Sequence, residues 1–244
     1  MTSMMMRVRG EQGVAVIIAV MSTTLMLTLG GALILLSSSE TAIAANFRAA
    51  HEATYAADAA IERALADLRN QADWTPVLAG TTQSLFADGL PSGTRTLADG
   101  STIDLDGIIN LANCQKTSVC SDAEVAAVTT DRPWGANNPR WTLFAYGPLA
   151  NTLGPATVRS AFYVLALVGD DPSENDGNPS VDGLMVANTP NPGNGIAVLR
   201  GEAFGPRGAH RVVEATITRL TIPPADPAGQ PSTELRVLSW REVR

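Results

Sequence analysis

Residues 14–36 read VAVIIAVMSTTLMLTLGGALILL, a run of 23 residues without a charged side chain. An α-helix rises 1.5 Å per residue, so this run spans roughly 34 Å, enough to cross the hydrocarbon core of a bilayer. A short leader, residues 1–13, precedes the run and contains Arg7 and Arg9 against one acidic residue, Glu11. Because basic residues favour the cytoplasmic side, we expect residues 14–36 to form a transmembrane helix and the rest of the chain to be exported.

The helix is expected to continue beyond the apolar run, through residues 37–72. Residues 42–66 contain 12 Ala, and no Gly or Pro occurs between residues 37 and 70, so helix propensity is high throughout. Apolar side chains recur there every three, four or seven positions, with charged residues between them. This pattern predicts an amphipathic stalk helix with one apolar stripe that needs a cover. The stripe comprises Ile43, Phe47, Ala50, Ala57, Ile61, Leu65 and Leu68.

Two glycines, Gly30 and Gly31, interrupt the apolar run. A glycine pair lowers helix stability by roughly 2 kcal/mol relative to two alanines, which predicts a kink or a melted turn. Small residues also allow close packing against a partner helix in a membrane. Both interpretations stay open at this stage.

Residues 73–244 have a different composition, with all 15 Pro and 17 of the 21 Gly at or after Pro76. Such turn-rich sequence with alternating apolar residues predicts a globular, β-rich head. An antiparallel sheet in this head would cover the stripe of the stalk helix, so the expected fold class is α+β. The expected strands are residues 141–146, 158–168, 195–203, 211–221 and 234–243, preceded by irregular structure or short hairpins with turns at Asp88-Gly89, Asp99-Gly100 and Asp106-Gly107.

The composition argues against two functional classes. The formal net charge of −7 makes an unspecific grip on nucleic-acid phosphates improbable. The chain has no Gly-x-Ser-x-Gly, no phosphate-binding Gly-Lys-Ser/Thr loop and no His-Glu-x-x-His. The two histidines, His51 and His210, are placed on the stalk helix and beside a turn, so no catalytic residue is expected and the chain is not expected to be an enzyme.

The two cysteines, Cys114 and Cys120, enclose a short loop in the exported head. An oxidising compartment favours a disulfide between them, which would stabilise the fold by about 2 kcal/mol. Two free thiols are the alternative. A redox-active pair is disfavoured, because the spacing is not that of Cys-x-x-Cys.

An acidic segment, residues 169–183, gathers five carboxylates, and no Lys or Arg occurs between Arg159 and Arg200. We favour a solvated acidic turn. The alternative is a Ca²⁺ site, since calcium prefers hard oxygen ligands on a glycine-broken loop, although the spacing does not match an EF-hand. The candidate calcium ligands are Asp171, Asn175, Asp176 and Asp182; the sequence implies no other cofactor.

The N-terminal pattern as a whole resembles a type IV prepilin: a short basic leader ending in Gly, an uncharged helix and an amphipathic continuation. Residues 10–70 are similar to the N-terminal region of PilX-like minor pilins. The similarity rests on the blocks GVAVIIAV (13–20), SET (39–41), IAANFR (43–48) and YAADAAIERAL (55–65), with EAFG (202–205) and VEA (213–215) as further fragments.

This resemblance implies that a membrane prepilin peptidase cleaves between Gly13 and Val14 and that the new terminus is usually N-methylated. Gly10 is a rival cleavage position, but cleavage there would leave Glu11 at the membrane face. Major pilins carry Glu at the fifth mature position, where this chain has Ile18. The departure resembles the K-type tip pseudopilin of type II secretion systems and suits a tip or priming subunit.

The resemblance further implies a minor subunit of a type IV pilus with a pilin-like fold. Its partners would be other minor pilins and the major pilin, contacted through the N-terminal helix, and a tip adhesin. The chain would first span the inner membrane once, with its head in the periplasm, and then enter the pilus at the cell surface. The alternatives are a K-type pseudopilin of type II secretion and a membrane-anchored periplasmic binding protein.

Overall fold

The computed structural model describes residues 11–152, 159–174, 176–183, 193–222 and 232–243. The chain divides into two compact units between Arg48 and Ala49, which we describe separately. The elements are α1 (Glu11–Leu68), α2 (Thr75–Leu78), β1 (Thr94–Thr96), β2 (Thr102–Asp104), α3 (Leu105–Cys114), α4 (Asp122–Val125), η1 (Gly135–Asn137), β3 (Thr142–Pro148), η2 (Leu149–Asn151), β4 (Tyr163–Asp170), β5 (Ile196–Gly205), η3 (Pro206–Gly208), β6 (Ala209–Ile222) and β7 (Ser232–Val243).

The first unit consists, in its described part, of the N-terminal portion of α1. This helix includes both the apolar run and the Ala-rich continuation, as the helix propensity of the sequence predicts. It continues through Gly30 and Gly31 without a break, so the melted turn is not found. The residues on both sides are strong helix formers and maintain the helix across the pair. The kink and the close packing against a membrane partner stay predictions.

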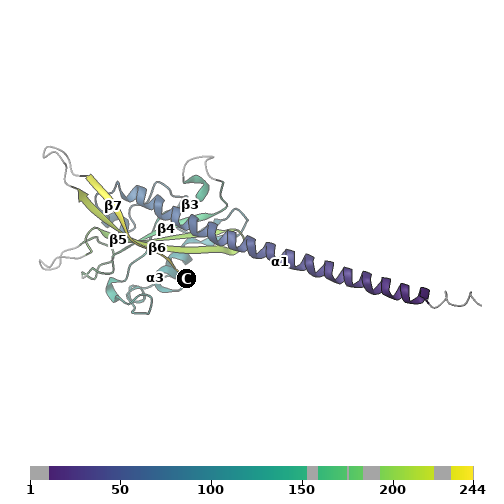
Figure 1. Cartoon of the computed structure of the whole chain (residues 1–244). Helices are drawn as coiled ribbons and strands as arrows, with labels where there is room; N and C mark the ends of the chain where they lie inside the picture. Colours follow the sequence, from purple (N-terminus) through teal and green to yellow (C-terminus); the bar gives the residue numbers. More distant parts are fainter. Residues whose placement is uncertain (1–10, 153–158, 175, 184–192, 223–231, 244) are drawn as a thin grey trace, which may run out of the picture. The chain divides into compact units, whose positions relative to one another are not determined.

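The second unit is built on a five-stranded antiparallel sheet with the order β3-β4-β5-β6-β7 (Figure 1). Each strand pairs with the next one in the sequence, so the sheet is a meander. The tight connection between β5 and β6 is η3, in which Arg207 and Gly208 adopt positive φ. All five predicted strands are confirmed, with boundaries that differ by a few residues.

One face of the sheet packs against residues 53–68 of α1 (Figure 1). The buried helix residues are mostly alanines, which let the helix backbone approach the strands closely. The approach is so close that a Cβ added to Gly201 on β5 would lie 2.3 Å from the carbonyl oxygen of Ala57. The antiparallel sheet therefore covers the apolar stripe from residue 53 onward, and the α+β fold is confirmed at this level.

The opposite face of the sheet is covered at β3 and β4 by a second core. Leu105 of α3 and Leu97 beside β1 pack there against Trp141, Leu143 and Leu165. A short extended segment also lies along β3, with a parallel bridge between Ala87 and Tyr146. Towards β5, β6 and β7 the same face carries charged side chains instead.

The α3 helix differs from the sequence-based expectation, which placed a turn at Asp106-Gly107. Asp104 caps the helix, because its side chain accepts a hydrogen bond from the Gly107 backbone N–H at 3.1 Å. Buried Leu105 then anchors the helix on the sheet. Asp106 and Gly107 therefore lie in the first turn of a helix, and the expectation of a turn was wrong there.

Candidate functional site

The apolar run of α1 is a candidate surface for contact with lipid or partner helices. Its large side chains, including those of Val14, Ile18 and Leu36, are all exposed in the isolated chain. Among the described residues, one helix is long and apolar enough to cross a membrane, with a mean hydropathy of 2.0 over its best window. This property is compatible with a single membrane span.

The residues of the proposed processing site lie at the beginning of this helix. Gly13 and Val14 are exposed and helical, as is Ile18 four residues further on. Residues 1–10 of the leader, including Gly10, lie outside the described residues. Cleavage between Gly13 and Val14 therefore stays a prediction.

Cys114 and Cys120 form a disulfide, as predicted, with a Cα–Cα distance of 6.0 Å. The bond joins the last residue of α3 to the segment that leads into α4. Ser121 and Glu124 then form a capping box at the beginning of α4. The disulfide and the capping box together fix the short α4 beside α3.

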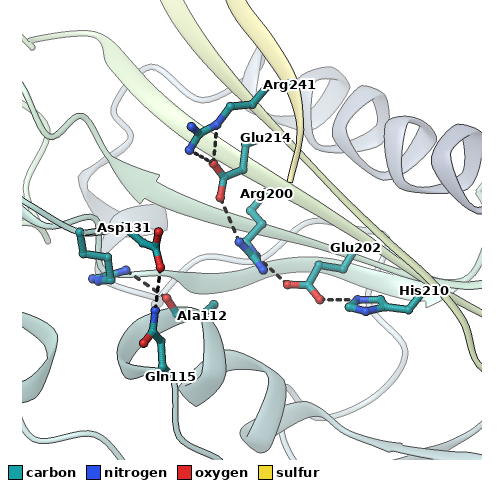
Figure 2. A network of polar contacts seen from close by, with 9 residues as sticks. Ala112, Gln115, Asp131, Arg200, Glu202, His210, Glu214 and Arg241 are labelled. Atoms are coloured by element: carbon teal, nitrogen blue, oxygen red, sulfur yellow. Dashed lines mark hydrogen bonds and ion pairs between the residues drawn. The ribbon is translucent and has the colours of Figure 1, made fainter. Parts of the chain in front are cut away.

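Arg132 also links α3 and α4, through its side chain. Its guanidinium donates hydrogen bonds to the carbonyl oxygens of Ala112 in α3 (3.0 Å), Val125 in α4 (3.4 Å) and Pro139 (2.7 Å). Close by, Gln115 donates a hydrogen bond to Asp131 at 3.1 Å (Figure 2). Arg132 therefore has a structural role: its positive charge satisfies free carbonyl groups at the C-terminal ends of α3 and α4.

Most carboxylates of the acidic segment are buried rather than solvated, although Ser173 and Gly177 are exposed, so the expected solvated turn was wrong for these carboxylates. Asp182 accepts hydrogen bonds from the Gly195 backbone N–H at 2.7 Å and from the Arg219 guanidinium at 3.1 Å. The backbone N–H of Asp182 also donates to the Thr75 hydroxyl at the beginning of α2. These contacts attach the end of the acidic segment to α2 and β6. Burial still raises the pKa of the Asp182 carboxyl above its ordinary value.

The other candidate calcium ligands do not join Asp182 in one group. Asp171 accepts hydrogen bonds from the backbone N–H and hydroxyl of Ser173. Asp176 accepts one from the Asn178 backbone N–H, while Asn175 lies outside the described residues. Within the described ranges, no set of three or more His, Cys, Asp or Glu side chains is arranged to hold a metal ion. The four-ligand calcium site stays a prediction.

Two further acidic residues are buried beside this segment, and both are about 3% exposed: Asp170 at the end of β4, and Glu174. Burial, with the nearby carboxylate of Glu174 as the second cause, raises the pKa of Asp170 to about 9. Both residues are among the five carboxylates of the acidic segment, but the sequence did not single them out as candidate calcium ligands. Their burial depends on the packing of the segment, which composition alone does not reveal.

A charge ladder runs across β5, β6 and β7 on the face opposite α1 (Figure 2). We use this name for Arg241, Glu214, Arg200, Glu202 and His210. Arg241 donates to Glu214 at 2.6 Å, and Arg200 donates to Glu214 at 2.9 Å and to Glu202 at 2.6 Å. His210 lies 3.0 Å from Glu202 and stacks on Phe204.

The most buried side chain of the charge ladder is that of Glu202, which is only 4% exposed. Burial alone would raise the pKa of this carboxyl, but the contacts with His210 and Arg200 outweigh burial and hold the pKa below its ordinary value. The family-like fragments at 202–205 and 213–215 supply two ladder residues, Glu202 and Glu214. Their pairing was not predicted, because it depends on the register between β5 and β6.

Comparisons of the sequence with protein-family models and with curated proteins, and of the structure with solved structures, find no match. The functional assignment therefore rests on the sequence pattern, the α+β fold and the exposed apolar helix.

Proposed function

We propose that this chain is a minor subunit of a type IV pilus with a pilin-like fold. A prepilin peptidase would remove its leader, and the mature chain would act as a structural, priming or tip subunit. The observation that carries the proposal is the composition of α1. One helix contains an apolar run with no cover in the isolated chain and an Ala-rich portion, residues 53–68, that forms the core of the second unit.

An exposed apolar helix of this length is unfavourable in water, because each Å² of apolar surface removed from water contributes roughly 25 cal/mol. Before assembly, the lipid of the membrane would cover this apolar surface. In a filament, neighbouring helices would replace the lipid, and Gly30 and Gly31 would allow close approach, since an added Cβ at either position meets nothing within 4 Å. The expected partners through this helix are therefore other minor pilins and the major pilin.

Ile18 supports a tip or priming position rather than a place in the shaft. A carboxylate in hydrocarbon is costly unless it is paired, so a subunit with Glu at this position needs a partner charge. Ile18 is exposed and apolar, and it imposes no such requirement. A tip position also allows contact with an adhesin above the subunit.

The processing reaction tests this proposal. The full chain is co-expressed with a prepilin peptidase, and the mature N-terminus is determined by sequencing and intact mass. We expect a chain that begins at Val14, with or without a methyl group. Gly13→Val should abolish processing, whereas the matched control Gly10→Val should be processed normally.

Two other results would contradict the proposal. A full-length unprocessed chain would indicate a simple membrane anchor, the alternative from another functional class. A soluble chain beginning after Ala44 would indicate a secretory signal. Processing at Val14 is expected equally of a K-type pseudopilin of type II secretion, so the presence of the subunit in purified pili is the measurement that separates these two filaments.

A further inference from the structure

The two edges of the five-stranded sheet differ in how they are covered. Residues 84–88 run beside the outer edge of β3 and form three backbone hydrogen bonds of 2.9–3.0 Å with Phe144 and Tyr146. The other edge is β7, which within the described residues pairs with β6 alone. Folded proteins usually protect a free edge, because its unpaired N–H and C=O groups bind further strands. The outer edge of β7 is therefore a candidate interaction surface.

The composition of β7 is unusual for a strand that faces water. Its 12 residues include no Pro and no Lys, two residue types that commonly protect free edges. Three large apolar side chains, those of Val237, Leu238 and Trp240, are between 49% and 56% exposed. A long edge with exposed apolar side chains favours association with another strand.

A register shift in β7 decides which of its side chains share a face. Leu238 is an extra residue, since β6 pairs with Val237 and Ser239 on either side of it. The alternation of side chains moves by one position there. Leu235 and Trp240, five positions apart, therefore lie on the face toward α1, where Leu235 packs against the main core and the Trp240 indole donates to an aspartate of α1 at 2.9 Å.

The opposite face of β7 carries charges of both signs. Glu234 and Arg241 precede and follow the apolar pair directly, so they share this face although they are seven positions apart. Arg241 joins the charge ladder there through Glu214. The side chains of Glu234 and Arg241 are 46% and 70% exposed, and each can reach a further partner at the edge.

This arrangement makes β7 complementary to a second β7 that runs antiparallel to it. When Leu235 lies opposite Trp240 of the second copy, Glu234 lies opposite its Arg241, and two-fold symmetry repeats both pairs. A shift of two residues in one direction sets Arg236 opposite Arg241, which places like charges together. A shift in the other direction sets Glu234 and Arg241 opposite serines. Charge complementarity therefore favours one register.

The paired sheets leave room for both copies of α1. The helix backbone lies over Gly201 on β5, and five strand spacings would separate the two β5 strands by about 24 Å. Packed helices need only about 8–10 Å between their axes. The two-fold axis is perpendicular to the sheet and reverses the direction of residues 53–68 between the copies. The contact is therefore not one between parallel subunits of a single filament.

We infer that the second unit binds a second copy of this chain edge to edge through β7. The two sheets join into one, with Leu235 opposite Trp240 and Glu234 opposite Arg241. The inference does not rest on the proposed pilus function, because leader processing tests α1 and not β7. Either can fail without the other.

Sedimentation of the full chain in detergent, at neutral pH and low ionic strength, tests the pairing. We expect a reversible monomer–dimer equilibrium. Glu234→Arg and Arg241→Glu each set like charges opposite each other twice, and each should weaken the dimer by a factor of about ten or more. The double variant restores opposite charges and should restore the dimer. The matched control is Asp122→Arg on α4, whose side chain is 88% exposed, and it should dimerise like the wild type.

Disulfide cross-linking tests the register. Glu234→Cys combined with Arg241→Cys should give a covalent dimer on oxidation. A bond within one chain is excluded, because seven positions along a strand span about 23 Å. Thr233→Cys combined with Arg241→Cys places the two thiols on opposite faces and should not cross-link. The native cysteines do not interfere, since they are bonded to each other.

Four outcomes would overturn the inference: a monomer at every concentration, a dimer that Glu234→Arg and Arg241→Glu leave unchanged, no recovery in the double variant, or equal cross-linking in the two cysteine pairs. If the variants do not fold, amide hydrogen exchange of the wild-type chain at low and high concentration decides. Slower exchange of residues 232–243 at high concentration supports the pairing, and unchanged exchange overturns it.

Discussion

Gly201 shows how a single residue positions the sheet against the helix. It lies on β5 beside the backbone of α1, and an added Cβ would lie 2.3 Å from the Ala57 carbonyl oxygen and 2.9 Å from Cγ1 of Ile61. The first of these atoms is helix backbone and cannot rotate away. Any side chain at position 201 must therefore move the helix or the strand.

We predict that Gly201→Ala lowers the free energy of unfolding by roughly 1–3 kcal/mol, the usual effect of overpacking a close contact. Chemical denaturation of the full chain in detergent, followed by tryptophan fluorescence, measures the loss. Gly31→Ala is the matched control, because its added Cβ meets nothing within 4 Å. Equal behaviour of the two variants would show that the contact at Gly201 does not limit packing.

At the scale of elements, the two faces of the sheet are stabilised differently. The face toward α1 is apolar and is covered by residues 53–68 of the helix. The opposite face is apolar at β3 and β4 but carries the charge ladder from β5 to β7. Arg200 stands at the centre of this ladder and contacts both Glu202 and Glu214.

We predict that Arg200→Met destabilises the chain by about 3 kcal/mol at pH 7, because the buried carboxylate of Glu202 and the partly buried carboxylate of Glu214 lose their shared cation. Thermal and chemical unfolding measure the difference. The control is Arg241→Met, in which the lost side chain is 70% exposed, and its effect should be below about 1 kcal/mol. Equal losses in the two variants would mean that burial does not strengthen the central pairs.

The same comparison has a pH dependence with a definite sign. The pKa of Glu202 is lowered in the folded state, so the stabilisation is present above the ordinary pKa of 4.5 and is lost as the pH falls through the lower folded value. The difference between wild type and Arg200→Met should therefore shrink as the pH is lowered below about 4.

At the scale of the whole molecule, the proposed function requires the first unit to contact lipid first and a filament afterwards. Position 18 is important in both environments, since a glutamate there must be paired with a positive charge in either one, whereas Ile18 needs no such partner. We predict that Ile18→Glu changes the number of pili per cell or moves the subunit away from the tip. Electron microscopy with immunogold labelling measures both quantities.

Ile18→Val is the conservative control and should leave pilus number and subunit position as in the wild type. If Ile18→Glu also left both unchanged, the residue would not specify a tip or priming role. The subunit could still belong to the pilus, because processing at Gly13 and Val14 is tested separately.

Several features of the fold could be read from local sequence. The Ala-rich, Gly-free stretch predicts the helix, since propensity summed over many residues is decisive for so long an element. Alternating apolar residues predict β3 to β7, and Gly205 to Gly208 marks the turn that joins β5 to β6. Cys114 and Cys120 are near enough in sequence for their disulfide to be predicted as well. Each of these features depends on residues that are close together along the chain.

Other features arise only when distant segments meet. A helix, α3, forms where the sequence predicted a turn, because Leu105 is buried against the sheet. The Asp182 side chain is buried and its backbone is fixed because Arg219 on β6 and Thr75 at α2 bind it, although 37 and 107 residues separate them from Asp182. The ladder forms because the register of β5 and β6 sets Arg200 opposite Glu214. The sequence by itself determined the helix, the strands and the membrane-compatible run, since these follow from local propensity and hydrophobic pattern. Tertiary structure alone decided which charges are buried and paired, because burial and pairing depend on contacts that no local pattern contains.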